Sequence, residues 1–344
     1  MRWALATCLL WSAIARADPA SHFAFRSYGS EEGLSNLSIN AVAQTSDGLL
    51  WVGTEDGLFA FDGAHFHRLG TTEGLPSSWI FSLLADDRGV WVGTARGLRH
   101  VDRDHVEPMV PGREVVEPRI NALAAGPDHR VWAATDLGLY AVRAGAITPV
   151  EGWSGGASDA VWIDRDGGVI AGRGSDLVAR AASGKWSVTA LGPDHISQIA
   201  RTPDGTLWVR SPRRLWSCSG SASSLACHDV STQLPDVGEV GRLLVDSRGS
   251  LWVATRRGLA HRVGDERWEM LGAAEGLPAR SVVSAFEDRE GSLWVIADQL
   301  YQQLGHGLWR AYSAETGLPG DTVWAITRDA HGELLIGTNA GVVE

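Results

Sequence analysis

The sequence predicts an all-β protein, a β-propeller of seven or eight four-stranded antiparallel blades with about 40 residues per repeat. Three observations support this prediction: one pattern recurs eight times, each copy holds four short apolar runs, and glycine and aspartate separate the runs. Successive anchor residues of the pattern lie 38 to 44 residues apart, the length of one blade. The anchors are Trp51, Trp91, Trp132, Ile170, Trp208, Trp252, Trp294 and Leu335.

The first repeat illustrates how the strands follow from the sequence. Apolar and polar residues alternate over residues 39–43, and apolar runs follow at 49–52, 58–61 and 65–69. Short runs of this kind, bounded by turn residues, are typical of antiparallel strands. No window has the apolar stripe of a capped helix, so each repeat predicts a four-stranded meander.

An aspartate near a glycine precedes most of the anchors. Aspartate can accept a hydrogen bond from its own backbone two residues on, and glycine readily adopts a positive φ, so we expect a tight hairpin between the first and second strands. Because these aspartates recur evenly, we interpret them as turn residues rather than calcium ligands. We expect the anchor tryptophan to pack between neighbouring blades. The aspartates are Asp47, Asp166, Asp204, Asp246, Asp288 and Asp329.

A Gly-Thr pair follows several anchors, as at Gly53-Thr54 and Gly93-Thr94. Small residues at this place fit a crowded turn near the central channel. In repeats four and five, Arg173 and Arg210 are expected to replace the threonine.

A second motif precedes several repeats. It reads Glu-Gly-Leu followed by Pro or Ser at residues 32–35, 73–76 and 275–278, and Thr-Gly-Leu-Pro at residues 316–319. Combined with Trp-Val-Gly-Thr and the later Gly-Leu, it resembles the two-component regulator propeller repeat over nearly all of residues 22–344. The resemblance implies a propeller fold and the periplasmic sensor region of a hybrid histidine kinase or diguanylate cyclase.

The N-terminal segment bears on how the ring closes. Residues 23–28 resemble the predicted outer strands at residues 65–69 and 308–312, so the chain begins with the last strand of a blade. Either this strand completes repeat eight and closes an eight-bladed ring, or seven blades close and repeat eight begins a second propeller. The resemblance favours the second arrangement, because sensors of this family usually carry two seven-bladed propellers before their membrane helix and output module.

Residues 1–17 have the features of a secretory signal peptide: Arg2, an apolar stretch, and the small-residue cleavage site Ala15-Arg16-Ala17. An uncleaved anchor is the alternative. Residues 18–344 then form the propeller, and we expect a periplasmic location, with the full-length protein anchored in the inner membrane. The net charge of −11 argues against nucleic acid or an anionic membrane as a partner.

Cys218 and Cys227 remain after removal of the signal peptide and flank a loop rich in serine, glycine and alanine. In an oxidising compartment they predict a local disulfide. A metal or redox pair is the alternative, but the spacing is not CxxC and no further cysteine is present in the mature chain.

The sequence contains no HExxH, GxSxG or Walker A motif, and we expect neither a cofactor nor a metal. His65 and His67 alternate on one strand face and could bind a metal. We favour the alternative that both histidines face solvent on an outer strand.

Departures from the repeat are where a binding site is expected, because function is placed on loops over a fixed scaffold. The turn between the second and third strands varies while its flanks do not, and in a propeller these turns gather at one mouth of the channel. Its arginines could clamp a carboxylate, sulfate or uronate, or they are solvated charges paired with the acids. The candidate ligand-binding residues are Glu55, Asp56, Arg96, Asp136, Arg256 and Arg257.

Trp79 and Trp324 lie near the start of innermost strands. They could stack on a sugar ring, although we favour packing between blades for both.

These features favour a sensing module, the extracytoplasmic domain of a membrane-bound signalling protein of two-component or cyclic-dinucleotide type, present as an N-terminal fragment. Its partners would be a small molecule or glycan at the channel mouth and a second copy in a homodimer. A free-standing periplasmic binding or scaffold propeller is the second hypothesis. A propeller lyase or glycosidase is the third; the four tyrosines all lie in predicted strands, and we expect no enzymatic activity of this chain.

Overall fold

The computed structural model describes residues 22–103, 105–108, 117–143, 145–235, 241–264, 267–279, 281–307, 310–312, 314, 317–320 and 322–343. The predicted signal peptide lies outside the described residues. Contacts within the chain define two units, residues 23–309 and a smaller unit of residues 1–22 and 310–344.

Residues 23–309 form seven four-stranded antiparallel sheets, which we call blades 1 to 7. Blade 1 comprises β3 (Ile39–Gln44), β4 (Leu50–Thr54), β5 (Gly57–Phe61) and β6 (Phe66–Leu69). Blade 2 comprises β7 (Ile80–Ala85), β8 (Val90–Thr94), β9 (Gly97–Asp102) and β10 (His105–Glu107). Blade 3 comprises β11 (Ile120–Ala125), β12 (Val131–Thr135), β13 (Gly138–Arg143) and β14 (Ala146–Pro149). Blade 4 comprises β15 (Ala160–Ile163), β16 (Val169–Arg173), β17 (Asp176–Arg180) and β18 (Trp186–Ala190).

The remaining blades continue the pattern. Blade 5 comprises β19 (Gln198–Arg201), β20 (Leu207–Arg210), β21 (Leu215–Ser221) and β22 (Ser224–Asp229). Blade 6 comprises β23 (Leu243–Val245), β24 (Leu251–Thr255), β25 (Gly258–Val263) and β26 (Arg267–Leu271). Blade 7 comprises β27 (Ser284–Glu287), β28 (Leu293–Ile296), β29 (Leu300–Gln303) and β2 (Phe25–Tyr28). The two-residue strand β1 (His22–Phe23) precedes β2, and short connections carry η1 (Ser30–Glu32), η2 (Ser231–Gln233), η3 (Ala273–Glu275) and η4 (Leu304–Gly307).

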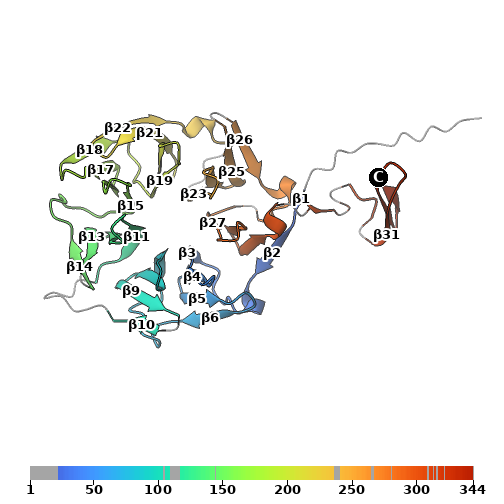
Figure 1. The fold of residues 1–344 in the computed structure, drawn as a ribbon, viewed down its shortest axis with the longest axis horizontal. Helices are drawn as coiled ribbons and strands as arrows, with labels where there is room; N and C mark the ends of the chain where they lie inside the picture. Colours follow the sequence, from blue (N-terminus) through green and yellow to red (C-terminus); the bar gives the residue numbers. More distant parts are fainter. Residues whose placement is uncertain are drawn as a thin grey trace, which may run out of the picture. The chain divides into compact units, whose positions relative to one another are not determined.

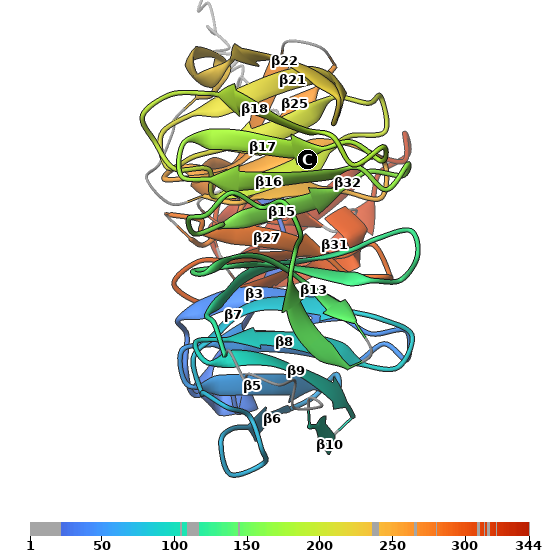
Figure 2. The ribbon, with the colours of Figure 1, turned by 90° about the vertical axis from the view of Figure 1, so that its left-hand side faces the viewer.

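The blades are arranged around a ring (Figure 1). The first strands of the blades, such as β3, β11, β15 and β23, lie toward its centre, and the last strands, such as β6, β10 and β22, lie at its rim. Within a blade the strands run side by side, as β15 to β18 do in Figure 2.

The N-terminal strand closes the ring at seven blades. β2 pairs antiparallel with β29, with Phe25 opposite Gln303 and Tyr28 opposite Leu300. The Tyr28 ring contacts Phe61 of blade 1 edge-on. Pairing β2 with β29 gives blade 7 the four strands of the other blades and joins the two ends of the ring, so that only the short outer edges of the blades remain.

This closure decides between the two alternatives for the ring and corrects one expectation, about residues 308–312. The eight-bladed ring does not form, because β2 completes repeat seven rather than repeat eight. The predicted outer strand at residues 308–312 is also not part of blade 7; β30 (Arg310–Ala311) is a two-residue strand of the other unit.

Repeat eight forms a three-stranded sheet of β31 (Val323–Arg328), β32 (Leu334–Thr338) and β33 (Gly341–Val343). It keeps the internal features of a blade, including the register shift between Val323 and Ala325. The residues of β31 are all exposed.

The anchor tryptophans pack between blades, as predicted. Trp51 of blade 1 lies in one apolar cluster with Ile80 and Val92 of blade 2. Trp294 of blade 7 lies in another with Phe59 of blade 1, so the same contact spans the point of closure.

The register of blade 5 corrects one assignment. Arg210 pairs with Gln198 in the way that Gly53 pairs with Ala41. Arg210 therefore replaces the glycine of the repeat, and Ser211 stands at the threonine position. Arg210 is fully buried, and its Nε donates to the backbone oxygen of Gly241.

Cys218 and Cys227 form the predicted disulfide. They face each other on the paired strands β21 and β22. Among the described residues, none of the helices has the length and apolar character needed to cross a bilayer.

Candidate functional site

A cavity of about 710 Å³ occupies the centre of the ring, and the first strands of all seven blades line it. Its wall is largely small and apolar, with alanine, valine, leucine and phenylalanine side chains. The charged or titratable residues among those that line it are Arg119, Asp159, His195 and Arg242.

Side-chain amides join neighbouring blades along this wall. Asn40 Nδ2 donates to the backbone oxygen of Ile80 at 2.9 Å, and Asn121 Nδ2 donates to that of Ser158 at 2.9 Å. Gln198 makes two such bonds with Leu243, one as donor and one as acceptor. The amides hold the first strands at fixed spacing, so the cavity has a rigid wall.

An aromatic pair marks one side of the channel mouth. The rings of Trp79 and Phe81 are stacked at 5.3 Å, and the Arg119 guanidinium lies 5.5 Å from the Phe81 ring. Trp79 is 45% exposed. Packing between blades, which we favoured for Trp79, is therefore wrong, and the ring is accessible to a ligand.

Trp324 is likewise not packed between blades, since it is 74% exposed on β31. It belongs to the smaller unit and not to the ring.

Arg119 is held by blade 3. Its backbone N–H donates to Asp136 Oδ1 at 2.9 Å, and its Nε donates to Asn121 Oδ1 at 2.8 Å. Asp159 accepts a hydrogen bond from Asn121 Nδ2 at 3.0 Å. The one acid of the cavity wall is therefore already engaged by a neighbouring blade.

The predicted site residues all lie on exposed turns between second and third strands. Glu55 and Asp56 join β4 to β5, Arg96 joins β8 to β9, and Asp136 joins β12 to β13. Arg256 and Arg257 join β24 to β25. None of the six is among the residues that line the central cavity.

A buried threonine explains why these turns vary only in the middle. Thr54 Oγ1 donates to the oxygen of Gly57 and accepts from the N–H of Asp56, both at 3.0 Å. Thr94, Thr135 and Thr255 make the same two bonds in their blades. The backbone is fixed by the threonine, and the two residues between are free to change.

The charged residues predicted for the site differ in whether they form ion pairs. Asp56 forms an ion pair with Arg68 at 3.1 Å. The side chains of Arg96, Arg256 and Arg257 have no hydrogen bond or ion pair with any described residue. No described residue engages these guanidinium groups, so they can contact a ligand at the turns.

Sequence reasoning missed Arg119, Asn121, Asp159, His195 and Arg242. They lie at or just before first strands, whereas the search for departures from the repeat concentrated on the turns between second and third strands. Aligning the repeats at the residues before the first strand would have revealed them.

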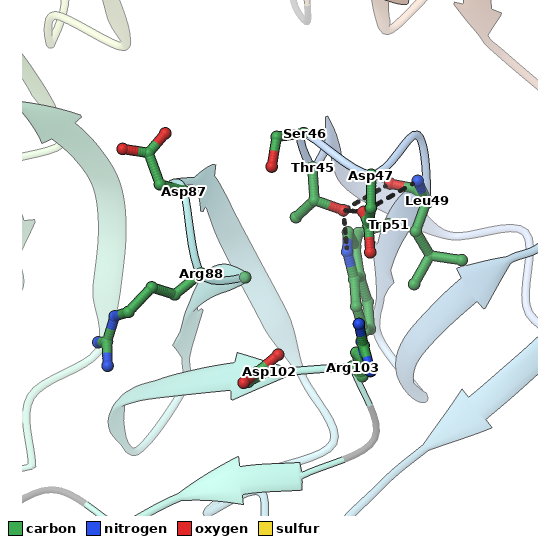
Figure 3. A pocket seen from close by; sticks show the side chains of 10 residues that line it. Thr45, Ser46, Asp47, Leu49, Trp51, Asp87, Arg88, Asp102 and Arg103 are labelled. Atoms are coloured by element: carbon green, nitrogen blue, oxygen red, sulfur yellow. Dashed lines mark hydrogen bonds between the residues drawn. The ribbon is translucent and has the colours of Figure 1, made fainter.

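A second cavity, of about 320 Å³, lies at the other end of blades 1 and 2 (Figure 3). Thr45 Oγ1 donates to Asp47 Oδ1 at 2.6 Å and accepts from Trp51 Nε1 at 3.3 Å. The hydrogen bond from Thr45 is the main cause that holds the pKa of Asp47 below its ordinary value. The aspartate thus acts within the turn, as predicted.

His65 and His67 are both exposed, and His67 Nε2 lies 3.1 Å from Asp62 Oδ2. Within the part of the chain that the structure describes, no group of three or more His, Cys, Asp or Glu residues is placed to hold a metal ion.

Comparison with known proteins supports the repeat assignment. The profile of the two component regulator propeller matches residues 33–56, 74–96 and 317–340. These segments run from the Gly-Leu of the preceding motif to the threonine turn of repeats one, two and eight. No curated protein sequence matches the chain.

Several solved structures share the fold. The extracellular domain of BT3049 from B. thetaiotaomicron, described as a hybrid two component system, has a TM-score of 0.72 at 17% identity, covering 94% of this chain and 49% of that one. The extracellular domain of BT4673 from the same organism has a TM-score of 0.65 at 17% identity, covering 92% and 45%. Virginiamycin B lyase from Staphylococcus aureus has a TM-score of 0.64 at 11% identity, covering 82% and 99%.

At these identities the structural likeness establishes the propeller fold. The chain spans about half the length of the two extracellular domains. The likeness to the two component regulator propeller rests on the three matched segments alone. The chain carries repeats of the two-component regulator propeller family.

Proposed function

We propose that this chain is the ligand-recognition propeller of an extracytoplasmic signalling protein of two-component or cyclic-dinucleotide type. The observation that carries the proposal is the match of three repeats to the two component regulator propeller. The extracellular domains of BT3049 and BT4673 support it through their shared fold. A signal peptide at residues 1–17 would export the chain, and a membrane anchor would lie outside it.

In this proposal the ring recognises a ligand at one mouth of its channel, and binding biases the arrangement of a receptor dimer across the membrane. A ligand can shift such an equilibrium only by its difference in affinity for the two states. The wall amides and the closed ring favour a rigid recognition surface over a catalytic one, and we propose that the chain itself is not an enzyme.

The free arginines Arg96, Arg256 and Arg257 supply the rim of this site, with Glu55, Asp56 and Asp136 between them. Replacing the three arginines by glutamine should weaken binding of sodium glucuronate by about tenfold, because charge-assisted hydrogen bonds are lost. Glucose serves as the neutral control ligand. Equal glucuronate affinity in wild type and variant would remove these residues from the site.

The test of the signalling role is the mass and location of the native polypeptide in its source cells, detected with an antibody against residues 22–309. A membrane-fraction band far above the 36.8 kDa of this chain is expected. A band at or just below 36.8 kDa outside the membrane fraction would overturn the receptor role.

That contrary result would favour a free-standing periplasmic binding or scaffold propeller. One structural observation supports this second candidate. Because β2 completes blade 7, the ring needs no strand from elsewhere to close.

A further inference from the structure

We propose that Arg242 binds the carboxylate of a small organic anion held in the central channel of the seven-bladed ring. The inference deepens the proposed recognition function and rests on it. It adds a residue inside the channel to those on the rim and names the class of ligand.

Arg242 is the charged exception in a ring of equivalent positions. In each blade, one residue in the first strand or directly before it lies opposite the second residue after the anchor, as Ala41 lies opposite Gly53. Arg242 occupies this place in blade 6, where its backbone oxygen accepts from the N–H of Ala254. The other six positions, which also line the cavity, are Ala41, Ser82, Ala122, Ala160, Gln198 and Ser284.

The backbone at Arg242 is fixed on both sides. Its N–H donates to the oxygen of Val283 in blade 7 at 3.0 Å. The next residue, Leu243, is held by both polar atoms of the Gln198 side chain in blade 5. Three blades therefore fix the backbone from which the Arg242 side chain extends.

No described residue pairs with the guanidinium of Arg242. Its side chain remains solvent-accessible and forms no hydrogen bond or ion pair with any described residue. Asp159, the acid of the cavity wall, is engaged by Asn121. Partial removal from water by the channel wall lowers the pKa of Arg242 below its ordinary value. An arginine nevertheless stays charged at neutral pH, so Arg242 is a cation of the channel wall that forms no ion pair with a described residue.

This arrangement favours an anion as the occupant. A partly desolvated charge is costly unless it is paired, and a planar guanidinium matches a carboxylate with two parallel hydrogen bonds. The net charge of −11 means that this cation is not part of a generally basic surface. The cavity of about 710 Å³ lies within the range of small-molecule sites, and its apolar lining suits a ligand with an apolar body.

The inference is tested on the full chain, without its signal peptide, by calorimetric titration at constant ionic strength. The probes are sodium benzoate, sodium acetate and sodium sulfate, with benzyl alcohol as the neutral counterpart of benzoate. We expect saturable binding of benzoate at one site, weaker binding of acetate, and no saturable binding of benzyl alcohol. Sulfate in place of benzoate as the tightest probe would overturn the assignment to a carboxylate with an apolar body.

Two variants locate the site. Arg242→Gln should weaken benzoate binding about tenfold or more, because the charge-assisted contact is lost. Arg165→Gln removes the same charge from an exposed turn between β15 and β16, and should bind benzoate as the wild type does. Unchanged affinity in Arg242→Gln, an equal loss in both variants, or no saturable binding of any anion would each overturn the proposal.

Folding is checked by circular dichroism. If Arg242→Gln does not regain the wild-type spectrum, Arg242→Lys replaces it, and wild-type affinity in that variant would overturn the two-pronged guanidinium contact. The native-mass experiment is independent of this one. A free-standing protein that binds benzoate through Arg242 would refute the signalling role and leave the anion site standing, and a receptor that binds no anion would do the reverse.

Discussion

At the scale of single residues, the glycine two positions after the anchor allows neighbouring blades to approach closely. A Cβ atom placed on Gly53 would lie 2.6 Å from Ile80 Cγ2 of blade 2, and one placed on Gly93 would lie 2.7 Å from Ile120 Cγ2 of blade 3. The sequence suggested a crowded turn here. All the crowding atoms at Gly53 come from the next blade, which no local pattern identifies, whereas at Gly93 the Ser82 hydroxyl of the same blade also contributes.

Replacing Gly53 by alanine should therefore destabilise the ring by about 1–3 kcal/mol, the usual cost of overpacking. Urea unfolding measures the change. Gly29→Ala is the control, because a Cβ there meets nothing within 4 Å and the φ of −156° is not in the positive range that favours glycine. A loss no larger than that of the control would show that the blades shift apart at little cost.

The residue six positions before the anchor accepts a hydrogen bond from the anchor tryptophan in blades 1 and 7. In blade 7 it is Asp288, 8% exposed, which accepts from Trp294 Nε1 at 2.8 Å and from the N–H of Ser292 at 2.7 Å. In blade 1 it is Thr45, and Asp47 is an exposed residue that only supports it.

We expect Asp288→Ala to cost about 1–3 kcal/mol, because it leaves two buried donors without a partner. Asp47→Ala, in which Thr45 still receives the indole N–H, should cost less than about 1 kcal/mol. The free energies of unfolding in urea decide between them. Equal losses would mean that the two kinds of turn are energetically equivalent.

At the scale of elements, the blade is a four-stranded meander, and specific side-chain contacts stabilise its turns and its connections. Glu73 Oε2 accepts from the N–H of Gly70 at 2.5 Å, and Glu275 repeats this bond with Gly272. The Glu-Gly-Leu motif that suggested the family is therefore a connector between blades, with its leucine buried. In blade 5, a disulfide adds a covalent fastening between β21 and β22.

Removing that disulfide by Cys218→Ala with Cys227→Ala should destabilise the chain by about 2–3 kcal/mol, because a short loop is no longer closed in the unfolded state. Urea unfolding with and without dithiothreitol measures the effect. The double variant is also the control, since reductant should not change its stability. A wild type that is insensitive to reductant would contradict the prediction.

At the scale of the whole molecule, stability depends on closing the ring with β2. Tyr28, 3% exposed, joins the two ends, since it contacts Phe61 of blade 1 and its hydroxyl donates to Gln302 of blade 7 at 2.8 Å. Residues 274 positions apart in the sequence thus meet at one point. Contacts between residues that are close in sequence cannot replace this contact between the first and last blades.

Tyr28→Ala should cost about 3–5 kcal/mol, as for other large aromatic residues removed from a core. Tyr312→Ala is the control, because Tyr312 is 47% exposed and should change the free energy of unfolding by less than about 0.5 kcal/mol. Urea unfolding of both variants gives the comparison. A small loss of unfolding free energy for Tyr28→Ala would mean that the ring stays stable without this contact between its first and last blades.

Repeat eight should behave differently from the blades under protease. Its sheet of β31 to β33 has three strands, and both large side chains Trp324 and Ile326 are exposed. We expect limited trypsin digestion to trim the chain within residues 313–344 and to leave the ring intact, as read by intact mass. Survival of the full-length chain would contradict this expectation.

The sequence by itself determined the blade. The spacing of the anchors, the Asp and Gly turns and the apolar runs are local features, and local hydrogen bonding and alternation suffice to predict four strands per repeat. The same features predicted that the anchor tryptophans pack between blades and that Cys218 and Cys227 pair. They also placed the variable turns, although not the cavity.

Only the tertiary structure decided the closure at seven blades and the content of the channel. The equal spacing of the repeats does not determine the angle between neighbouring blades. That angle depends on how the faces of two blades pack, as where Ile80 packs against Gly53. The ring then brings one residue from each of seven blades to a common cavity. Arg242 is visible as an exception only when those seven positions, some 40 residues apart in sequence, are seen together in space.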